Sequence, residues 1–293
     1  MKRILVATDF SERSDRALRR ATLLARHSGA ALTIVHGLDD DRSKRIVERE
    51  HYEMENLLRD LTSTLTSVDG LKSSWRIVLG EPSQAILQAV KDERPDLLVL
   101  GPHRRQIFRD IFVGTTVERT IRGTDCPVLM ANATPVGPYR HVLLSTDLSE
   151  GSRDAMAKYL SLSLAEEPRH SVLHVFDAPM LRLAMSHEIA DEEREAYLDD
   201  QRSIARLELQ KFIAATGLTS ARVVLRHDAT DPNHEILAAA NLARADLIVM
   251  ATHSKRGLER LLLGSTTERV LRDSEIDVLA IPPARTMGAD LRP

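Results

Sequence analysis

The sequence predicts an α/β protein made of two tandem, doubly wound α/β sandwiches. One observation is an internal repeat, in which residues 8–17 align with residues 146–155 and share Thr, Asp, Ser, Glu, Ser and Ala. A second is a pair of apolar stretches, 96–103 and 246–253, each followed by the same glycine-hydroxyl motif. A third is the alternation of strand-like and helical patterns, because parallel strands need a crossover of about a dozen residues between them.

The two copies differ in length. Residue 9 aligns with residue 147 and residue 96 with residue 246, so the offset rises from 138 to 150 and the second copy carries 12 additional residues. We expect these residues to lengthen the charged helical region at 181–211. The segment 131–139 is small, polar and proline-bearing, which is typical of a linker. We therefore expect a first domain at residues 1–134, a linker at 135–138 and a second domain at 139–293.

The elements follow one order in both copies. An apolar strand precedes a helix whose alanines and leucines repeat on one face. After a second strand, a long helix and a third strand, Pro82 or Pro232 opens a helix, where a proline loses no hydrogen bond. The fourth strand is fully apolar and hence buried on both faces, and right-handed crossovers complete a doubly wound sandwich. The expected strands are 3–8, 31–36, 74–78, 97–100 and 128–130, then 141–145, 171–176, 222–225, 247–250 and 278–281.

Composition argues against several classes of function. Only 3% of the residues are aromatic, which disfavours a stacking platform for single-stranded nucleic acid. The net charge is −3 and no basic block occurs, which disfavours nonspecific binding to DNA or to an acidic membrane. The single cysteine, Cys126, is interpreted as a small buried residue rather than a reactive thiol. The first apolar run is too short for a signal peptide and no run spans a bilayer, so we expect a cytoplasmic protein.

Two aspartates stand where such folds bind ligands. In doubly wound sheets the ligand lies beyond the carboxyl ends of the strands, where the strand order reverses. Asp9 and Asp147 follow the first strand of each copy. One interpretation makes each aspartate a helix N-cap, with Glu12 or Glu150 three residues later. The other makes its carboxylate a contact for a ribose or a base edge.

A stronger motif follows the fourth strand, where a glycine and two hydroxyl residues open a helix. Glycine lets a phosphate approach the backbone, the first amides of a helix point outward, and the hydroxyls add donors. The motif predicts an anion site, although a plain helix start also explains either copy alone. The two copies are Gly114-Thr115-Thr116 and Gly264-Ser265-Thr266.

These residues together resemble the universal stress protein family. The resemblance rests on Asp-Phe-Ser after strand one, on His36 or His174 at the end of strand two, and on a Gly-x-x-Gly-x9-Gly-Ser/Thr pattern after strand four. It covers essentially the whole chain as a tandem pair. It implies a five-stranded parallel sheet of order 3-2-1-4-5 in each copy and an intramolecular pseudo-dimer through the last strands, and leaves a homodimer of the tandem open. Some members of the family bind ATP and others do not.

Carried over position by position, the resemblance assigns one nucleotide site to each copy. The base-contacting aspartate falls on Asp9 and Asp147. The residue beside the adenine falls on Gly37 and Val175. The closing glycine and hydroxyls of the phosphate loop are present in both copies.

The rest of the phosphate loop departs from the family pattern. The first glycine is kept as Gly101 but is Ala251 in the second copy, and the second glycine is replaced by Arg104 and by Ser254. Ala251 and Ser254 are small and still allow backbone approach. Arg104 is bulky and either obstructs the phosphate path or places a cation on it. We therefore favour the second copy as the nucleotide site and expect the first to be degenerate or to prefer another anion.

The leading hypothesis is a stress protein that binds ATP, with or without Mg²⁺, and hydrolyses it very slowly or not at all. The sequence contains no GxxxxGK[ST] loop, and it therefore also lacks the lysine of that loop, which supports phosphoryl transfer. The alternative is a ligand-free scaffold with degenerate sites. A dinucleotide oxidoreductase is disfavoured because Ala7-Thr8-Asp9-Phe10-Ser11 stands where GxGxxG would lie. The histidines show no metal-ligand spacing, so no metal site is expected.

Overall fold

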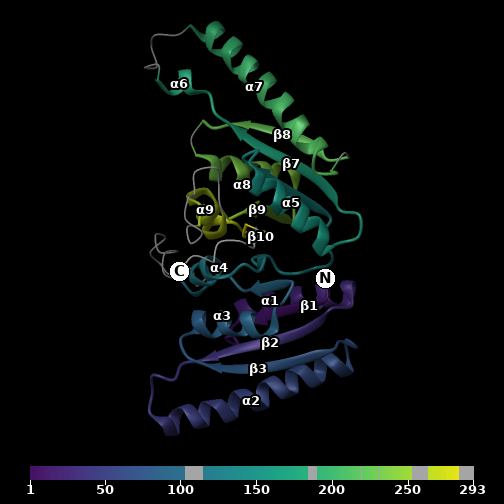
Figure 1. The fold of residues 1–293 in the computed structure, drawn as a ribbon, viewed down its shortest axis with the longest axis vertical. Coiled ribbons are helices and arrows are strands. Elements are labelled where there is room, and N and C mark those ends of the chain that lie inside the picture. Colours follow the sequence, from purple (N-terminus) through teal and green to yellow (C-terminus); the bar gives the residue numbers. More distant parts are fainter. Residues whose placement is uncertain (103–114, 184–189, 219, 230, 253–262, 284–293) are drawn as a thin grey trace, which may run out of the picture.

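All the strands of the described chain belong to one sheet. The computed structural model describes residues 1–102, 115–183, 190–218, 220–229, 231–252 and 263–283. Within these ranges ten strands form a single sheet with helices on both faces (Figure 1). The elements of the first half are β1 (Arg3–Ala7), α1 (Glu12–Ser28), β2 (Ala31–Leu38), α2 (Lys44–Ser67), β3 (Ser73–Leu79), α3 (Pro82–Glu93), β4 (Leu97–Leu100), α4 (Thr116–Gly123) and β5 (Val128–Met130).

The second half repeats this order with one addition, the short helix α6. Its elements are β6 (His141–Thr146), α5 (Glu150–Leu162), β7 (Arg169–Phe176), α6 (Pro179–Leu183), α7 (Asp191–Ala214), β8 (Arg222–His227), α8 (Pro232–Ala243), β9 (Leu247–Ala251), α9 (Ser265–Asp273) and β10 (Asp277–Ile281). None of the helices in the described ranges is long and apolar enough to cross a membrane.

The strand order confirms two doubly wound sheets. It runs β3-β2-β1-β4-β5-β10-β9-β6-β7-β8, which is order 3-2-1-4-5 followed by its mirror sequence. Every pair of neighbouring strands within a half is parallel. Among the described strands, the central pair of β5 and β10 is the antiparallel one. Helices α2 and α7 therefore lie at opposite ends of the molecule, as Figure 1 shows.

The antiparallel pair joins the halves about a local two-fold axis. Leu129 pairs with Leu279, and these two residues are equivalent at the repeat offset of 150. Val128 pairs with Ala280 and Met130 with Val278, which again exchanges equivalent positions. The two halves therefore form the expected pseudo-dimer, in which the last strand of each half, β5 and β10, pairs with the other.

Two continuous cores lie on the two faces of the sheet. One contains the buried faces of α1 and α2 from the first half together with those of α5 and α7 from the second. The other contains those of α3, α4, α8 and α9. The apolar strands contribute to both cores, because successive side chains of a strand point to opposite faces.

Most of the additional residues of the second copy lie in or just before the charged region at 181–211, as expected, although the long helix itself is no longer than its counterpart. Helix α7 has 24 residues, the same as α2. Between β7 and α7 lie 14 residues, where five separate β2 from α2, and the short helix α6 stands in this longer stretch.

A buried ion pair fixes the junction of the halves. Arg20 of α1 is 4% exposed and Asp277 of β10 is fully buried, and the Arg20 Nε donates to Asp277 Oδ2 over 2.8 Å. The Tyr139 hydroxyl donates to the same oxygen over 2.6 Å, and the Arg20 guanidinium lies 4.2 Å from the Tyr139 ring centre. Arg20 Nη1 also donates to the Gly137 carbonyl over 2.8 Å. One side chain thus connects the first half, the connecting segment and the second half.

The carboxylate of Asp277 has three donors in this buried setting. Its other oxygen accepts from the Ala133 amide over 3.0 Å. Burial raises the pKa of Asp277 above its ordinary value, while Arg20, Tyr139 and Ala133 oppose that shift. A buried charge without partners costs several kcal/mol, so each of these donors matters to folding.

Asp277→Ala should destabilise the protein by about 3–5 kcal/mol, because it leaves the Arg20 guanidinium buried without its counter-charge. Urea unfolding followed by circular dichroism measures the loss. Glu53→Ala is the matched control, since it breaks the exposed Arg49–Glu53 pair on α2 and should cost about 0.5 kcal/mol or less. Equal losses in the two variants would show that the junction does not depend on this pair.

The thiol of Cys126 should be unreactive in the folded protein. Its side chain is 6% exposed, and burial raises its pKa to about 12. Because the thiolate is the reacting species, iodoacetamide at pH 8 should label Cys126 only after unfolding, as mass spectrometry would detect. Complete labelling of the native protein within minutes would contradict the buried position.

Candidate functional site

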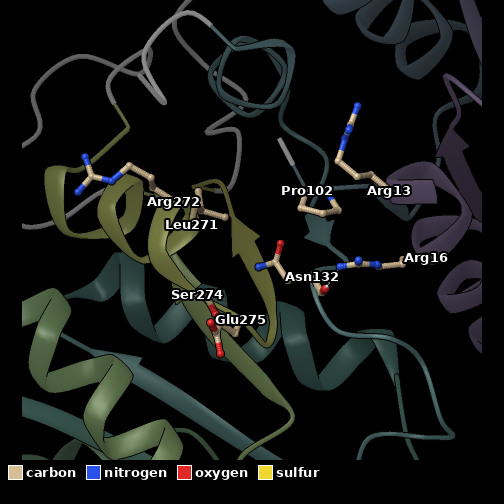
Figure 2. A pocket seen from close by; sticks show the side chains of 8 residues that line it. All are labelled: Arg13, Arg16, Pro102, Asn132, Leu271, Arg272, Ser274 and Glu275. Carbon is tan, nitrogen blue, oxygen red and sulfur yellow. Dashed lines mark hydrogen bonds between the residues drawn. The ribbon is translucent and has the colours of Figure 1, made fainter. Parts of the chain in front are cut away.

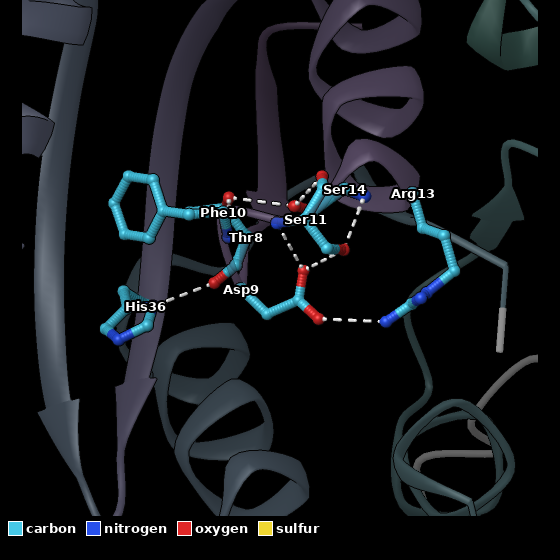
Figure 3. A network of polar contacts seen from close by, with 7 residues as sticks. All are labelled: Thr8, Asp9, Phe10, Ser11, Arg13, Ser14 and His36. Atoms are coloured by element: carbon cyan, nitrogen blue, oxygen red, sulfur yellow. Dashed lines mark hydrogen bonds and ion pairs between the residues drawn. The ribbon is translucent and has the colours of Figure 1, made fainter. Parts of the chain in front are cut away.

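The loop after β1 holds its aspartate by hydrogen bonds to the cap of α1. Asp9 Oδ1 accepts from the Ser11 amide over 3.1 Å and from the Ser11 hydroxyl over 2.5 Å, as Figure 3 shows. The Ser11 hydroxyl in turn accepts from the Ser14 amide, which makes Ser11 the N-cap of α1. The interpretation of Asp9 as the N-cap is therefore wrong, because the cap lies two residues later.

The second half repeats this arrangement around Asp147. Its Oδ1 accepts from the Ser149 amide over 3.0 Å and from the hydroxyls of Ser149 and Ser152 over 2.5 and 2.6 Å. Ser149 is the N-cap of α5, so the N-cap interpretation fails for Asp147 as well. The two aspartates position the caps and keep their carboxylates at the carboxyl edge of the sheet.

Asp9 is ionised over the whole neutral range. Burial raises the pKa of Asp9, but hydrogen bonds from Ser11 and the guanidinium of Arg13 outweigh it and hold the pKa below its ordinary value. Arg13 Nη2 lies 3.5 Å from Asp9 Oδ2, and the aspartate side chain is 62% exposed. The outer carboxylate oxygen of Asp9 therefore reaches solvent.

The same loop contains a strained residue that the sequence analysis missed. Phe10 and Leu148, which are equivalent in the repeat, both have positive φ angles, of 56° and 64°. A non-glycine residue in this region costs about 1–2 kcal/mol. The hydroxyl of the threonine two residues earlier, Thr8 or Thr146, accepts from the strained residue's amide over 3.0 or 2.9 Å. The repeated Thr-Asp-x-Ser motif was the signal for this turn.

The strand-two histidines have a structural contact in both halves. His36 Nδ1 lies 2.9 Å from the Thr8 carbonyl, and His174 Nδ1 lies 2.9 Å from the Thr146 carbonyl. The rings of His36 and Phe10 also pack at 5.2 Å between centroids. Each histidine thus connects its strand to the start of the loop that carries the aspartate. No group of three or more histidine, cysteine or acidic residues in the described ranges is arranged to hold a metal ion.

In the first half, helices pack closely against two of the glycines assigned to the ligand. A Cβ on Gly101 would lie 2.6 Å from the carbonyl oxygen of Arg13, so the first turn of α1 already occupies that side. A Cβ on Gly37 would lie 3.1 Å from Ala85 Cβ of α3. Helix packing thus requires the glycine at 101, and a side chain at 37 would need α3 to shift by a few tenths of an ångström. Val175, the counterpart of Gly37, packs against the core on the α8 and α9 face.

The helix after β9 is fixed to the end of that strand. The Gly264 amide donates to the Thr252 carbonyl over 2.8 Å, and the Thr267 hydroxyl donates to the Ala251 carbonyl over 3.0 Å. These bonds place the first turn of α9 at the carboxyl end of β9. Ser265 is exposed and Thr266 is partly exposed, so their hydroxyls lie at the surface of this turn.

The two glycine-hydroxyl helices begin differently. In the first half Thr115 is the N-cap and its Oγ1 accepts from the Glu118 amide over 3.2 Å. In the second half Gly264 is the N-cap, and no side chain of the described residues caps α9. The helix α9 therefore starts one repeat position earlier than α4, with amides that no cap side chain occupies. In the first half the Thr115 hydroxyl accepts from an amide of the first helical turn. In the second half a ligand anion would be the acceptor for the amides of that turn.

The surroundings of Gly101 exclude a side chain, whereas those of Gly264 leave room for one. Gly264 has a φ of −61°, which any residue adopts. A Cβ there would lie 3.4 Å from the Thr252 carbonyl and 3.9 Å from Thr267 Oγ1, which are ordinary contacts. Neither the backbone conformation nor packing against the described residues demands a glycine at this position.

Matching ion pairs hold both helices in place. Arg119 of α4 pairs with Glu81 over 3.4 Å, and Arg269 of α9 pairs with Asp231. The four residues are equivalent at the offset of 150. The remaining predicted loop residues, Arg104, Gly114 and Ser254, lie outside the described residues.

Gly101→Ala should destabilise the protein by about 1–3 kcal/mol, because the new methyl group overlaps the Arg13 carbonyl. Urea unfolding measures the change. Gly137→Ala is the control, since a Cβ at Gly137 meets nothing within 4 Å and its φ is not positive. An unchanged midpoint for Gly101→Ala would mean that α1 moves without cost and that packing does not explain the glycine.

Comparison with known proteins agrees with the tandem architecture. The profile of the universal stress protein family matches residues 1–132 and 138–282. The chain is 23% identical over 310 residues to universal stress protein E of Escherichia coli strain K12, covering 96% of this chain and 93% of the relative. It is 24% identical over 156 residues to a universal stress protein of Methanocaldococcus jannaschii, covering 44% of this chain and 93% of the relative.

Solved structures share the fold over the full length. A universal stress protein from Archaeoglobus fulgidus superposes with a TM-score of 0.69 at 19% identity, covering 95% of this chain and 97% of that one. A protein of unknown function from Pseudomonas aeruginosa PAO1 superposes with a TM-score of 0.68 at 18% identity, covering 97% and 93%. With the family profile matching both halves, this chain belongs to the universal stress protein family.

Proposed function

We propose that the chain is a nucleotide-binding universal stress protein of the cytoplasm whose second half binds ATP. The observation that carries the proposal is the start of α9. It is fixed to the end of β9, it has no side-chain cap, and it opens with a glycine that packing does not require. Open amides at a helix start together with the macrodipole favour a phosphate group.

The other residues assigned to the second site fit this arrangement. Asp147 is held at the carboxyl end of β6, which is the neighbour of β9 in the sheet. Both strand ends therefore face the same edge, with the aspartate on one strand for the ribose or base and α9 on the next for the phosphates. Mg²⁺ would accompany the nucleotide as the counter-ion of its phosphates.

The first half supports nucleotide binding less well. Thr115 caps α4, and Gly101 and Gly37 are closed over by α1 and α3. The family glycine at position 104 is an arginine. We propose that the first half has lost the ATP site and serves as the structural partner of the second.

We propose binding with very slow hydrolysis or none. No GxxxxGK[ST] loop is present in the sequence. Positioned charges on the transferred phosphoryl group supply most of the catalysis in nucleotide hydrolases, and the lysine of that loop is one of them. Protein that releases no nucleotide on denaturation, and whose melting temperature is unchanged in millimolar ATP, would favour a ligand-free scaffold instead.

ATP with Mg²⁺ should raise the melting temperature of the wild type, because a ligand at about 100 times its Kd adds about 2.7 kcal/mol of stability. Gly264→Glu should abolish this shift by placing a carboxylate where the phosphates bind. Thermal denaturation across an ATP titration measures it, with isothermal titration calorimetry as a direct check.

Two further variants make the assignment specific. Gly264→Ala should keep the unliganded melting temperature, since its Cβ makes only ordinary contacts. Gly114→Glu changes the equivalent residue of the first half and should leave the ATP shift intact. If Gly114→Glu abolished the shift and Gly264→Glu did not, the nucleotide site would belong to the first half.

A further inference from the structure

A cavity lies between the two halves, away from the start of α9. Its volume is about 390 Å³, which falls in the range of small-molecule sites. One wall comes from the first half, with Arg13 and Arg16 of α1 and Pro102 after β4. The opposite wall comes from the second half, at the end of α9 and the turn into β10. Figure 2 shows Asn132 between these walls.

The α1 wall presents two arginines one helical turn apart. Arg16 is partly buried, and its Nη1 donates to the Asn132 carbonyl over 3.0 Å. Among the described residues, no carboxylate forms an ion pair with Arg16. Arg13 forms a long ion pair with Asp9, with 3.5 Å between Nη2 and Oδ2, and the Arg13 side chain is 36% exposed. Two guanidinium groups therefore line the cavity, and within the described part of the chain Asp9 is the carboxylate that pairs with them.

The lining of the cavity holds three arginines and one carboxylate, so its charge is net positive. Glu275 is the acidic residue of the lining, and it is exposed to solvent. The guanidinium of Arg272 extends away from Arg13 and Arg16 in Figure 2, so its stem and Leu271 form that part of the wall. The side chain of Asn132 is held by a 3.0 Å bond to the Ile276 carbonyl. This contact fixes the segment to which Arg16 is bonded.

The other half offers an internal comparison. The repeat places Gly151 at the position of Arg13 and Asp154 at the position of Arg16. It places Asp125 at the position of Glu275. The local two-fold axis thus relates the cavity to a region where both α1 arginines are missing and one is replaced by an acid. The basic character belongs to this one side and does not follow from the fold.

We propose that this cavity binds a small phosphorylated molecule through the guanidinium groups of Arg13 and Arg16. Planar guanidinium groups donate two parallel hydrogen bonds to phosphate oxygens. Pro102 and Leu271 supply apolar surface for the rest of the ligand. The site is separate from the proposed nucleotide site at the start of α9, and it does not depend on that proposal. Because Arg13 also contacts Asp9, the occupant competes with the carboxylate for the same guanidinium.

Inorganic pyrophosphate is a suitable probe, because it carries the charge of the ligand without a nucleoside. Isothermal titration calorimetry at constant ionic strength should give a Kd of about 1 mM or below for the wild-type protein. Arg16→Gln should raise this Kd about tenfold or more, and Arg13→Gln should raise it as well, because each removes charge-assisted hydrogen bonds. Arg49→Gln, at an exposed arginine of α2, should leave the Kd unchanged.

Gly264→Glu separates this proposal from the nucleotide site. Pyrophosphate should keep its wild-type Kd in Gly264→Glu, and adding Arg16→Gln to that variant should raise the Kd about tenfold or more. Binding lost in Gly264→Glu and kept in Arg16→Gln would place the anion at α9 and overturn the proposal, as would the absence of binding to the wild type at 10-fold above the expected Kd. The melting temperature of each unliganded variant, compared with the wild type, establishes that it is folded, and an unfolded Arg16→Gln would be replaced by Arg13→Gln in the same comparison.

Discussion

The antiparallel pairing of β5 and β10 is the constraint on which the rest of the structure depends. It is short, since β5 has only three residues, yet it turns two five-stranded sheets into one. Because the pair is centred on the equivalent residues Leu129 and Leu279, it also imposes a two-fold relation on everything around it. The helices α4 and α9 meet across this axis, where Arg122 Nη2 lies 3.5 Å from Glu268 Oε2. The two cores extend over both halves for the same reason.

The ion pair at the junction breaks this symmetry. The repeat places Pro127 at the position of Asp277 and Lys158 at the position of Arg20, so no second copy of the pair exists. A buried ion pair returns little net stability compared with apolar packing, but removing one partner is costly. The pair therefore adds little to the stability of the native arrangement. Its main effect is to raise the free energy of alternative arrangements, in which one of the two charges would be buried without its partner. Gly137 and Tyr139 bring the connecting segment into the same cluster, so that the order of the halves along the chain is part of the packing.

The sequence was sufficient for the fold because periodicity and repetition are local signals. Apolar strands, helix-opening prolines and the change of offset between the copies all appear within short stretches, and the strand order followed from the family resemblance. The ion pair was not predictable, because Arg20 and Asp277 are 257 residues apart and each looks like an ordinary surface charge in its own segment. The N-cap interpretation of Asp9 and Asp147 failed for a local reason. Several hydroxyl and acidic residues in a row could cap the helix, and only backbone geometry shows that Ser11 and Ser149 do so.

The glycines show why a ligand motif needs geometry as well as spacing. Sequence comparison treats Gly101 as the retained member of the phosphate loop and Ala251 as its loss. In the structure Gly101 is explained by the carbonyl of Arg13, which leaves no space for a side chain. Its presence is therefore no evidence for a ligand, and Ala251 is no evidence against one. Gly264 is the reverse case, because its φ and its neighbours would accept a side chain. A small residue that the fold does not require is the stronger indication of a ligand, and for this reason we propose the nucleotide site in the half whose motif is less complete.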